Sequence, residues 1–226
     1  MKTNLAILLL LSLFASGFTM QTKKKIAFFG DSITQQGAGA DGYIKKMDSL
    51  LTAKNHSANY ELIGAGISGN KIYDLYLRMD TDVLAKNPDA VVIYIGINDV
   101  WHKRTSGTGT DPDRFERFYN AIIKKLKERN IAVYLCTPSV IGEKTDFTNQ
   151  LDGDLNQYAA MVRNIAKANN CPVIDLRQAF LDHLKTNNPE NKDRGVLTTD
   201  GVHLNRTGNI FVAQQIYNAL SKDFIK

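Results

Sequence analysis

The sequence predicts an α/β fold in which helices cover both faces of a five-stranded parallel sheet. Along the 226 residues, five short apolar segments alternate with segments that have the periodicity of amphipathic helices. The length suits one domain rather than two, and we find no internal repeat or low-complexity linker. Hydrophobic residues make up 43% and charged residues 23%, a composition typical of a globular chain with a single core.

The five predicted strands are runs of apolar residues, as expected for strands that are covered on both faces. They comprise residues 25–29, 60–63, 91–95, 131–136 and 172–176. The predicted helices repeat apolar residues at three- and four-residue spacing. They cover residues 43–51, 112–126, 155–166 and 207–220. Asp111 and Pro112 favour a helix start at that point, because aspartate caps helices and proline suits their first turn.

Charge and cysteine content exclude several classes of protein. Lys and Arg exceed Asp and Glu by 28 − 23 = 5, but the only basic run is residues 23–25, so we expect no nucleic-acid partner. Neither a CxxC nor an HExxH motif is present, so no metal site is expected. Cys136 ends one predicted strand and Cys171 begins the next, about 16 Å apart. A disulfide needs Cα atoms within about 7 Å, which predicts two free, buried thiols.

The N-terminus has the pattern of a cleaved secretory signal peptide. Lys2 precedes an apolar run at residues 5–14, and Ala15-Ser16-Gly17 supplies the small residues that favour cleavage. We expect a signal peptide at residues 1–17, with cleavage as far along as residue 20, followed by a single domain at residues 23–226. The apolar run is shorter than the roughly 20 residues of a membrane span, although an uncleaved anchor is the alternative. The protein is therefore expected to be exported to the periplasm or the extracellular space, without stable membrane insertion.

Three polar or glycine-rich segments follow predicted strands, at the edge where parallel sheets bind ligands. Ser32 lies at the first strand-to-helix turn, where its hydroxyl is placed like a nucleophile. Gly66 lies in a glycine-rich loop after the second strand, and Asn98 follows the third. Ordinary helix caps are the alternative interpretation of Ser32 and of Asn98.

The segment Asp200-Gly201-Val202-His203 comes just before the last predicted helix. An aspartate three residues ahead of a histidine can bind one imidazole nitrogen while the other faces a serine, as acyl transfer requires. Alone, the segment could equally be a surface turn. All four segments converge on one edge of the predicted sheet, so a shared site explains them better than coincidence does.

GDSIT at residues 30–34, the loop at Gly66, GIND at 96–99 and DGVH at 200–203 resemble the four sequence blocks of the SGNH (GDSL-type) hydrolase family. The resemblance spans essentially the whole mature chain. It implies a flavodoxin-like, three-layer α/β/α sandwich with sheet order 2-1-3-4-5, and ester hydrolysis without a cofactor. One departure is that Gly64 and Ala65 replace the Asn and Arg that many members carry before the second-block glycine, which alters the pocket wall.

The same resemblance implies a role for each matching residue. Ser32 would be the nucleophile, His203 the general base and Asp200 its orienting partner. The backbone N–H groups of Ser32 and Gly66, with the Asn98 side chain, would form the oxyanion hole.

Substrate contacts are harder to predict. Asp31, Trp101 and His102 are the side chains we expect to contact substrate, and Trp101 opens a polar loop at the mouth of the site. Burial of that tryptophan and solvent exposure of that histidine are the alternatives. The rim loops carry few apolar residues, so we expect a short, acetyl-like acyl group on a carbohydrate. A lysophospholipase, a thioesterase or an acyltransferase with the same triad are alternatives, and the oligomeric state is open.

Overall fold

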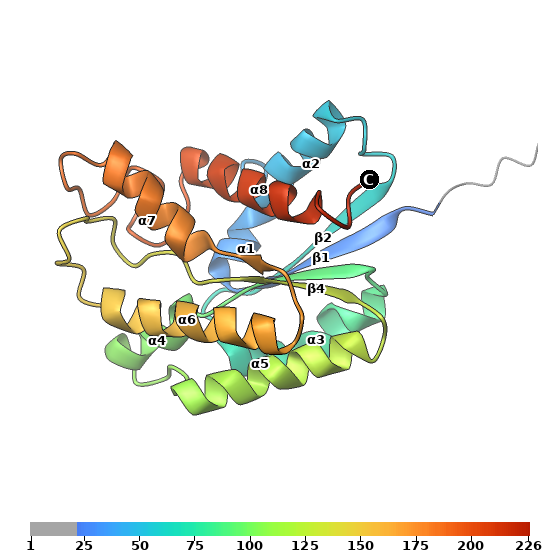
Figure 1. Cartoon of the computed structure of the whole chain (residues 1–226), viewed down its shortest axis with the longest axis horizontal. Coiled ribbons are helices and arrows are strands. Elements are labelled where there is room, and N and C mark those ends of the chain that lie inside the picture. Colours follow the sequence, from blue (N-terminus) through green and yellow to red (C-terminus); the bar gives the residue numbers. More distant parts are fainter. Residues whose placement is uncertain (1–21) are drawn as a thin grey trace, which may run out of the picture.

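The computed structural model describes residues 22–226, so the predicted signal peptide lies outside the described residues. Its centre is a five-stranded parallel sheet with strand order β2-β1-β3-β4-β5, seen in Figure 1. The strands are β1 (Lys24–Gly30), β2 (Tyr60–Gly66), β3 (Ala90–Tyr94), β4 (Ala132–Cys136) and β5 (Val173–Ile174). The predicted fold class and strand order are confirmed.

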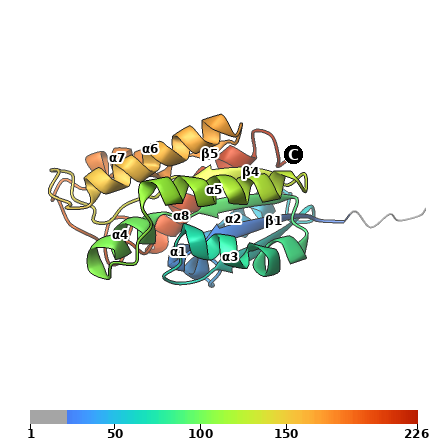
Figure 2. The ribbon, with the colours of Figure 1, turned by 90° about the horizontal axis from the view of Figure 1, so that it is seen from below.

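Helices cover both faces of the sheet, which gives three layers (Figures 1 and 2). One face carries α1 (Ser32–Gly37), α2 (Tyr43–Ala53) and α8 (Arg206–Leu220). The other carries α3 (Ile72–Asp82), α5 (Pro112–Lys127) and α6 (Asp152–Ala168), with the short 3-10 turn η1 (Leu84–Lys86) after α3. The remaining helices are α4 (Ile97–Thr105) and α7 (Leu176–Asn187). The helix α7 packs on α8 through Phe180 and Phe211, whose ring centroids are 5.5 Å apart.

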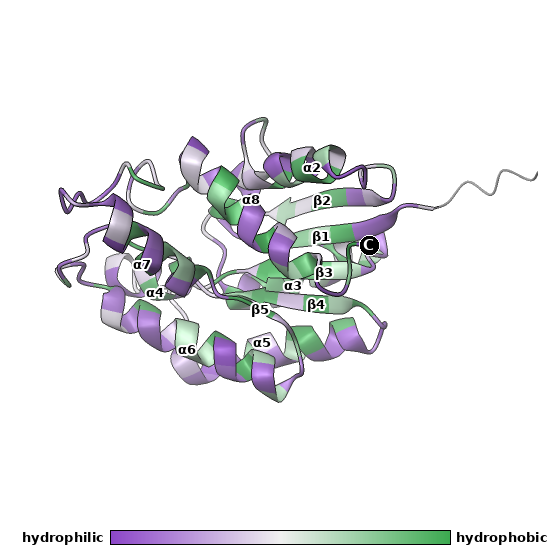
Figure 3. Cartoon of the chain, turned by 45° about the horizontal axis from the view of Figure 1, so that its top comes forward, coloured by the Kyte–Doolittle hydropathy of each residue, from purple (hydrophilic) through white to green (hydrophobic). Residues whose placement is uncertain are grey.

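The core lies between the sheet and its two helical layers. Every residue of β3 is buried, as are the last five of β1, and Figure 3 shows hydrophobic colour over most of both strands. Phe28 of β1 contacts Tyr43 of α2 edge to face, with centroids 5.8 Å apart. Each fully buried side chain of this size contributes about 1.5–3 kcal/mol by leaving water. The sheet edge that carries the site is therefore held by a rigid centre.

Two local predictions are wrong. The fifth strand has two residues instead of five, because it is an edge strand that pairs only with β4, and Asp175 already caps α7 by accepting from the Gln178 N–H. The polar stretch after the third strand is helical as far as Thr105, where α4 ends, and the N-terminal turn of this helix packs into the core. Trp101 and His102 are consequently helical.

Both cysteines are free thiols, as predicted. Cys136, at the end of β4, is buried. Cys171 is only partly buried, so its predicted burial is wrong. It lies in the turn between α6 and the edge strand β5, where no further strand covers it.

The register of the sheet brings the strand ends together. Gly30, the last residue of β1, lies beside Gly66 of β2 on one side and Tyr94 of β3 on the other. The segments that follow these strands therefore emerge at one edge, on the left in Figure 1. Within residues 22–226, the helices are all too short or too polar to cross a membrane.

Candidate active site

Ser32 lies where β1 gives way to α1. Asp31 caps this helix, because its Oδ1 accepts a hydrogen bond of 2.9 Å from the Ile33 N–H. The helix cap is thus Asp31 and not Ser32. Ser32 itself is the first helical residue and is 7% exposed, so its backbone is fixed on both sides by regular structure.

Ser32, His203 and Asp200 form a continuous chain of hydrogen bonds. Ser32 Oγ lies 2.9 Å from His203 Nε2, and His203 Nδ1 lies 2.7 Å from Asp200 Oδ2. With the imidazole proton on Nδ1, that nitrogen donates to the carboxylate and Nε2 accepts from the serine hydroxyl. An imidazole held in this way can remove the hydroxyl proton as the oxygen attacks a carbonyl.

A tight turn holds the aspartate and histidine together. Asp200 Oδ1 accepts from the N–H groups of Val202 and His203, at 3.0 and 2.8 Å. Gly201 has a φ of +94°, a conformation that favours glycine. Burial raises the pKa of Asp200, but the hydrogen bonds from His203 and from the turn outweigh burial, and the pKa lies below its ordinary value. The carboxylate is therefore ionised beside the imidazole at neutral pH.

Gly66 ends β2 directly against α1. A Cβ atom at this position would lie 2.1 Å from the backbone nitrogen of Gln35 and 2.5 Å from the carbonyl carbon of Thr34. Only glycine permits this close approach. The loop after Gly66 therefore starts beside the first turn of α1, which contains Ser32.

Asn98 lies in the first turn of α4 and is 3% exposed. Its Nδ2 donates a 3.1 Å hydrogen bond to the backbone oxygen of Asn70, in the loop that follows Gly66. An amide nitrogen carries two N–H groups, and this bond uses one of them. The same bond ties the α4 terminus to the loop after β2.

Two buried carboxyl groups lie near these residues. Burial raises the pKa of Asp31 to about 7, against the lowering effects of its bond from the Ile33 N–H and of the His203 charge. Burial likewise raises the pKa of Asp99 to about 7, although the Ile72 N–H donates to its Oδ1. The other carboxyl oxygen of Asp99 has no hydrogen-bond partner among residues 22–226.

The predicted substrate contacts occupy different environments. Asp31 is 1% exposed and its described contacts are those of a helix cap. Trp101 and His102 are half-buried on α4, with ring centroids 6.0 Å apart. Burial lowers the pKa of His102, and the nearby Lys71 charge adds to this effect. A contact between substrate and any of the three stays a prediction.

Arg78 of α3 has a structural role that the sequence did not reveal. Its guanidinium donates to the backbone oxygens of Gly30 and Ala65, at 2.8 and 3.0 Å, and to the Asn70 side chain at 2.6 Å. It thereby joins the ends of β1 and β2 to the loop that Asn98 contacts. No motif marks this arginine, because its role depends on a helix that lies outside the four recognised segments.

In the part of the chain that is described, no cluster of three or more His, Cys, Asp or Glu side chains is placed to hold a metal ion. The side chains at this edge instead offer a serine hydroxyl, an imidazole, a carboxylate and an amide. That set matches the requirements of acyl transfer, in which a serine oxygen attacks a carbonyl and N–H groups stabilise the resulting oxyanion.

Comparison with known proteins gives consistent matches. The model of the GDSL-like lipase/acylhydrolase family matches residues 28–209. An acetylxylan esterase of Geobacillus stearothermophilus is 29% identical over 90% of this chain and 96% of its own length. A GDSL esterase/lipase of Arabidopsis thaliana is 27% identical over 90% of this chain and 88% of its own.

Solved structures agree with these matches. The crystal structure of the acetyl xylan esterase AlAXEase has a TM-score of 0.85 and 59% identity, covering 87% of this chain and 99% of its own. The Geobacillus acetylxylan esterase Axe2 has a TM-score of 0.78 and 27% identity, covering 92% of this chain and 98% of its own. Two other structures of Axe2 are of variants called catalytic mutants, in which a histidine or a serine is replaced by alanine. The family match covers most of the chain, and the protein therefore belongs to the GDSL-like lipase/acylhydrolase family and is a carboxylic ester hydrolase.

Proposed function

We propose that this esterase removes acetyl groups from an acetylated carbohydrate, with xylan or xylooligosaccharides as the first candidates, through a Ser32–His203–Asp200 triad. The observation that carries the mechanism is the hydrogen-bond chain of 2.9 and 2.7 Å that links the three side chains. The substrate class is supported by the 59% identity to an acetyl xylan esterase over 87% of the chain. The catalytic serine and histidine variants of Axe2 support the same residue types.

In the first half of the proposed reaction, Ser32 Oγ attacks the acetyl carbonyl carbon while His203 Nε2 takes the hydroxyl proton. Asp200 keeps the imidazole in the required tautomer and stabilises its positive charge. The N–H groups of Ser32 and Gly66 and the free N–H of Asn98 stabilise the oxyanion. His203 then gives its proton to the sugar oxygen as the carbon–oxygen bond breaks, leaving acetyl-Ser32.

In the second half, His203 takes a proton from a water molecule that attacks the acetyl carbonyl. The tetrahedral intermediate collapses, Ser32 Oγ regains the proton from His203, and acetic acid leaves and ionises in solution. His203 carries each proton transfer at the reacting atoms.

Hydrolysis of a series of esters tests the proposal. We expect mature protein to hydrolyse 4-nitrophenyl acetate faster than the butyrate and octanoate, to release acetate from acetylated xylooligosaccharides, and to lose both activities in Ser32→Ala. Preference for octanoate would instead indicate a lysophospholipase or thioesterase. Acetyl transfer to added sugar hydroxyls in place of acetate release would indicate an acyltransferase.

We also propose that the protein is exported by cleavage of residues 1–17. The motif at the N-terminus supports this, and a polymeric substrate that cannot enter a cell suits an exported enzyme. Sequencing the N-terminus of protein recovered outside the cytoplasm tests it: a start between residues 18 and 21 is expected, and a start at Met1 would contradict it.

A further inference from the structure

The segment that carries Asp200 and His203 is held in place by a buried carboxylate, Glu143, in the loop after β4. Glu143 is 0% exposed, and it takes part in no salt bridge with residues 22–226. A buried carboxylate without a cation is costly unless hydrogen bonds satisfy its oxygens. The groups that donate hydrogen bonds to Glu143 therefore stabilise its buried charge.

All four donors to this carboxylate come from three consecutive residues shortly before Asp200. Oε2 accepts from the Val196 N–H at 2.7 Å. Oε1 accepts from the N–H groups of Leu197 and Thr198, at 2.7 and 2.6 Å, and from Thr198 Oγ1 at 2.9 Å. Such charge-assisted bonds are about twice as strong as neutral ones.

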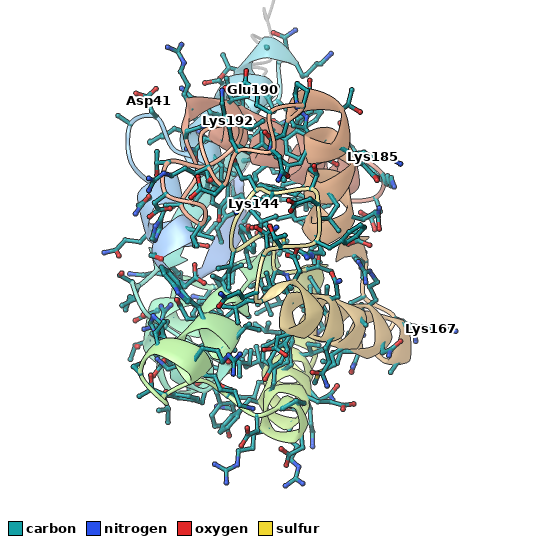
Figure 4. The ribbon with its side chains drawn as sticks, turned by 90° about the vertical axis from the view of Figure 1, so that its left-hand side faces the viewer. Asp41, Lys144, Lys167, Lys185, Glu190 and Lys192 are labelled. Atoms are coloured by element: carbon teal, nitrogen blue, oxygen red, sulfur yellow. The ribbon has the colours of Figure 1, made fainter. Side chains whose placement is uncertain are left out.

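The Thr198 hydroxyl links the Glu143 carboxylate to the turn that carries Asp200 and His203. While it donates to Glu143, its oxygen accepts a 3.1 Å hydrogen bond from the Gly201 N–H. A second contact runs alongside, because the Gly142 N–H donates to the Gly201 oxygen at 2.8 Å. The two loops thus lie side by side; Figure 4 faces this edge and labels Lys144 on one loop and Glu190 and Lys192 on the other.

Asp200 has no comparable anchor of its own. Its side chain is 46% exposed, and the hydrogen bonds of its carboxylate, within the described chain, all come from Val202 and His203 of the same turn. The side-chain hydrogen bonds of Asp200 are therefore internal to the turn, and the place of the turn depends on the backbone that flanks it. The distance between His203 Nε2 and Ser32 Oγ depends on where that backbone is held.

We propose that Glu143, acting through Thr198, is a positioning residue that sets the distance between His203 and Ser32. The proposal rests on the proposed triad. It predicts that removing the hydrogen bonds between Glu143 and Thr198 leaves substrate binding intact and slows the chemical step. The reason is that a displacement of a catalytic group by about 1 Å can cost about 100-fold in rate.

Two substitutions at Thr198 provide the test: valine has nearly the shape of threonine without the hydroxyl, and serine keeps the hydroxyl without the methyl group. Thr198→Val removes the hydroxyl that joins Glu143 to Gly201, whereas Thr198→Ser keeps it. With 4-nitrophenyl acetate we expect Thr198→Val to lower kcat by about 10- to 100-fold at unchanged KM, and Thr198→Ser to stay within about twofold of wild type. Glu143→Gln, which places an amide N–H against a backbone donor, is expected to resemble Thr198→Val.

A spectroscopic signal separates positioning from general loss of stability. The proton between His203 Nδ1 and Asp200 should give a far-downfield resonance that shifts or broadens in Thr198→Val and not in Thr198→Ser. Leu126→Ala serves as the control, because Leu126 is fully buried near the start of β4, at the opposite edge of the sheet. It should lower the melting temperature and leave kcat unchanged below the transition.

Unchanged kcat in Thr198→Val would overturn the proposal, and so would an equal loss of kcat in folded Leu126→Ala. A fall in Thr198→Ser as large as in Thr198→Val would also overturn it. Failure of the triad itself would be distinguished by Ser32→Ala, which would then retain activity.

Discussion

Replacing Asn98 by alanine should separate catalysis from folding. The amide of Asn98 donates one N–H to the Asn70 oxygen at 3.1 Å, and its second N–H is the one proposed to bind the oxyanion. Removing one such donor typically costs about 100- to 1,000-fold in kcat, or about 2.7–4 kcal/mol of transition-state stabilisation. Folding should lose only the single bond to Asn70, about 0.5–1.5 kcal/mol.

For a domain of this size, that loss corresponds to a fall in melting temperature of about 1–6 °C. Steady-state hydrolysis of 4-nitrophenyl acetate and thermal unfolding followed by circular dichroism give the two quantities on one preparation. Asn98→Asp is the matched variant, since it keeps the shape but offers an acceptor to the oxyanion and should be no more active than Asn98→Ala. Turnover of Asn98→Ala within a fewfold of wild type would refute the role of the amide.

Two further predictions concern buried groups. Burial raises the pKa of Asp99 from 3.8 to about 7, so the folded state binds this proton more tightly than the unfolded state does. The resulting contribution to the free energy of unfolding is complete below about pH 4 and is lost as the pH rises through 7, by up to about 4 kcal/mol. Urea unfolding between pH 4 and 8 should show this decline in the wild type and a shallower one in Asp99→Asn, and parallel profiles would count against it. Cys136 and Cys171 are free, so thiol titration of denatured, unreduced protein should give two thiols. In native protein the half-buried Cys171 should react first, and earlier reaction of Cys136 would contradict its burial.

Much of the fold was predictable because its strands are short runs that contain few polar residues. Residues 91–95 are apolar throughout, and β3 lies there within one residue. The fifth strand was overestimated, since the apolar residues after Ile174 pack as part of α7 and not in the sheet. Helix α4 was missed because its exposed residues are mostly polar and its apolar residues occur only in its first half.

The candidate site was predictable to the extent that each residue lies in a short recognisable motif. Ser32 and His203 are 171 positions apart, yet motif and topology placed both at one sheet edge, and their side chains are in contact. Arg78 and Glu143 were not predictable, because neither belongs to a motif. Their importance comes from backbone groups that only the folded chain brings to them.

The proposed acyl-enzyme on Ser32 is the centre of this account, and it can be observed directly. Mixing the protein with 4-nitrophenyl acetate, whose leaving group makes acylation fast, and quenching in acid within milliseconds should yield a peptide carrying one acetyl group on Ser32. Ser32→Ala should yield none. An acetyl group on another residue, or full turnover by Ser32→Ala, would contradict the mechanism.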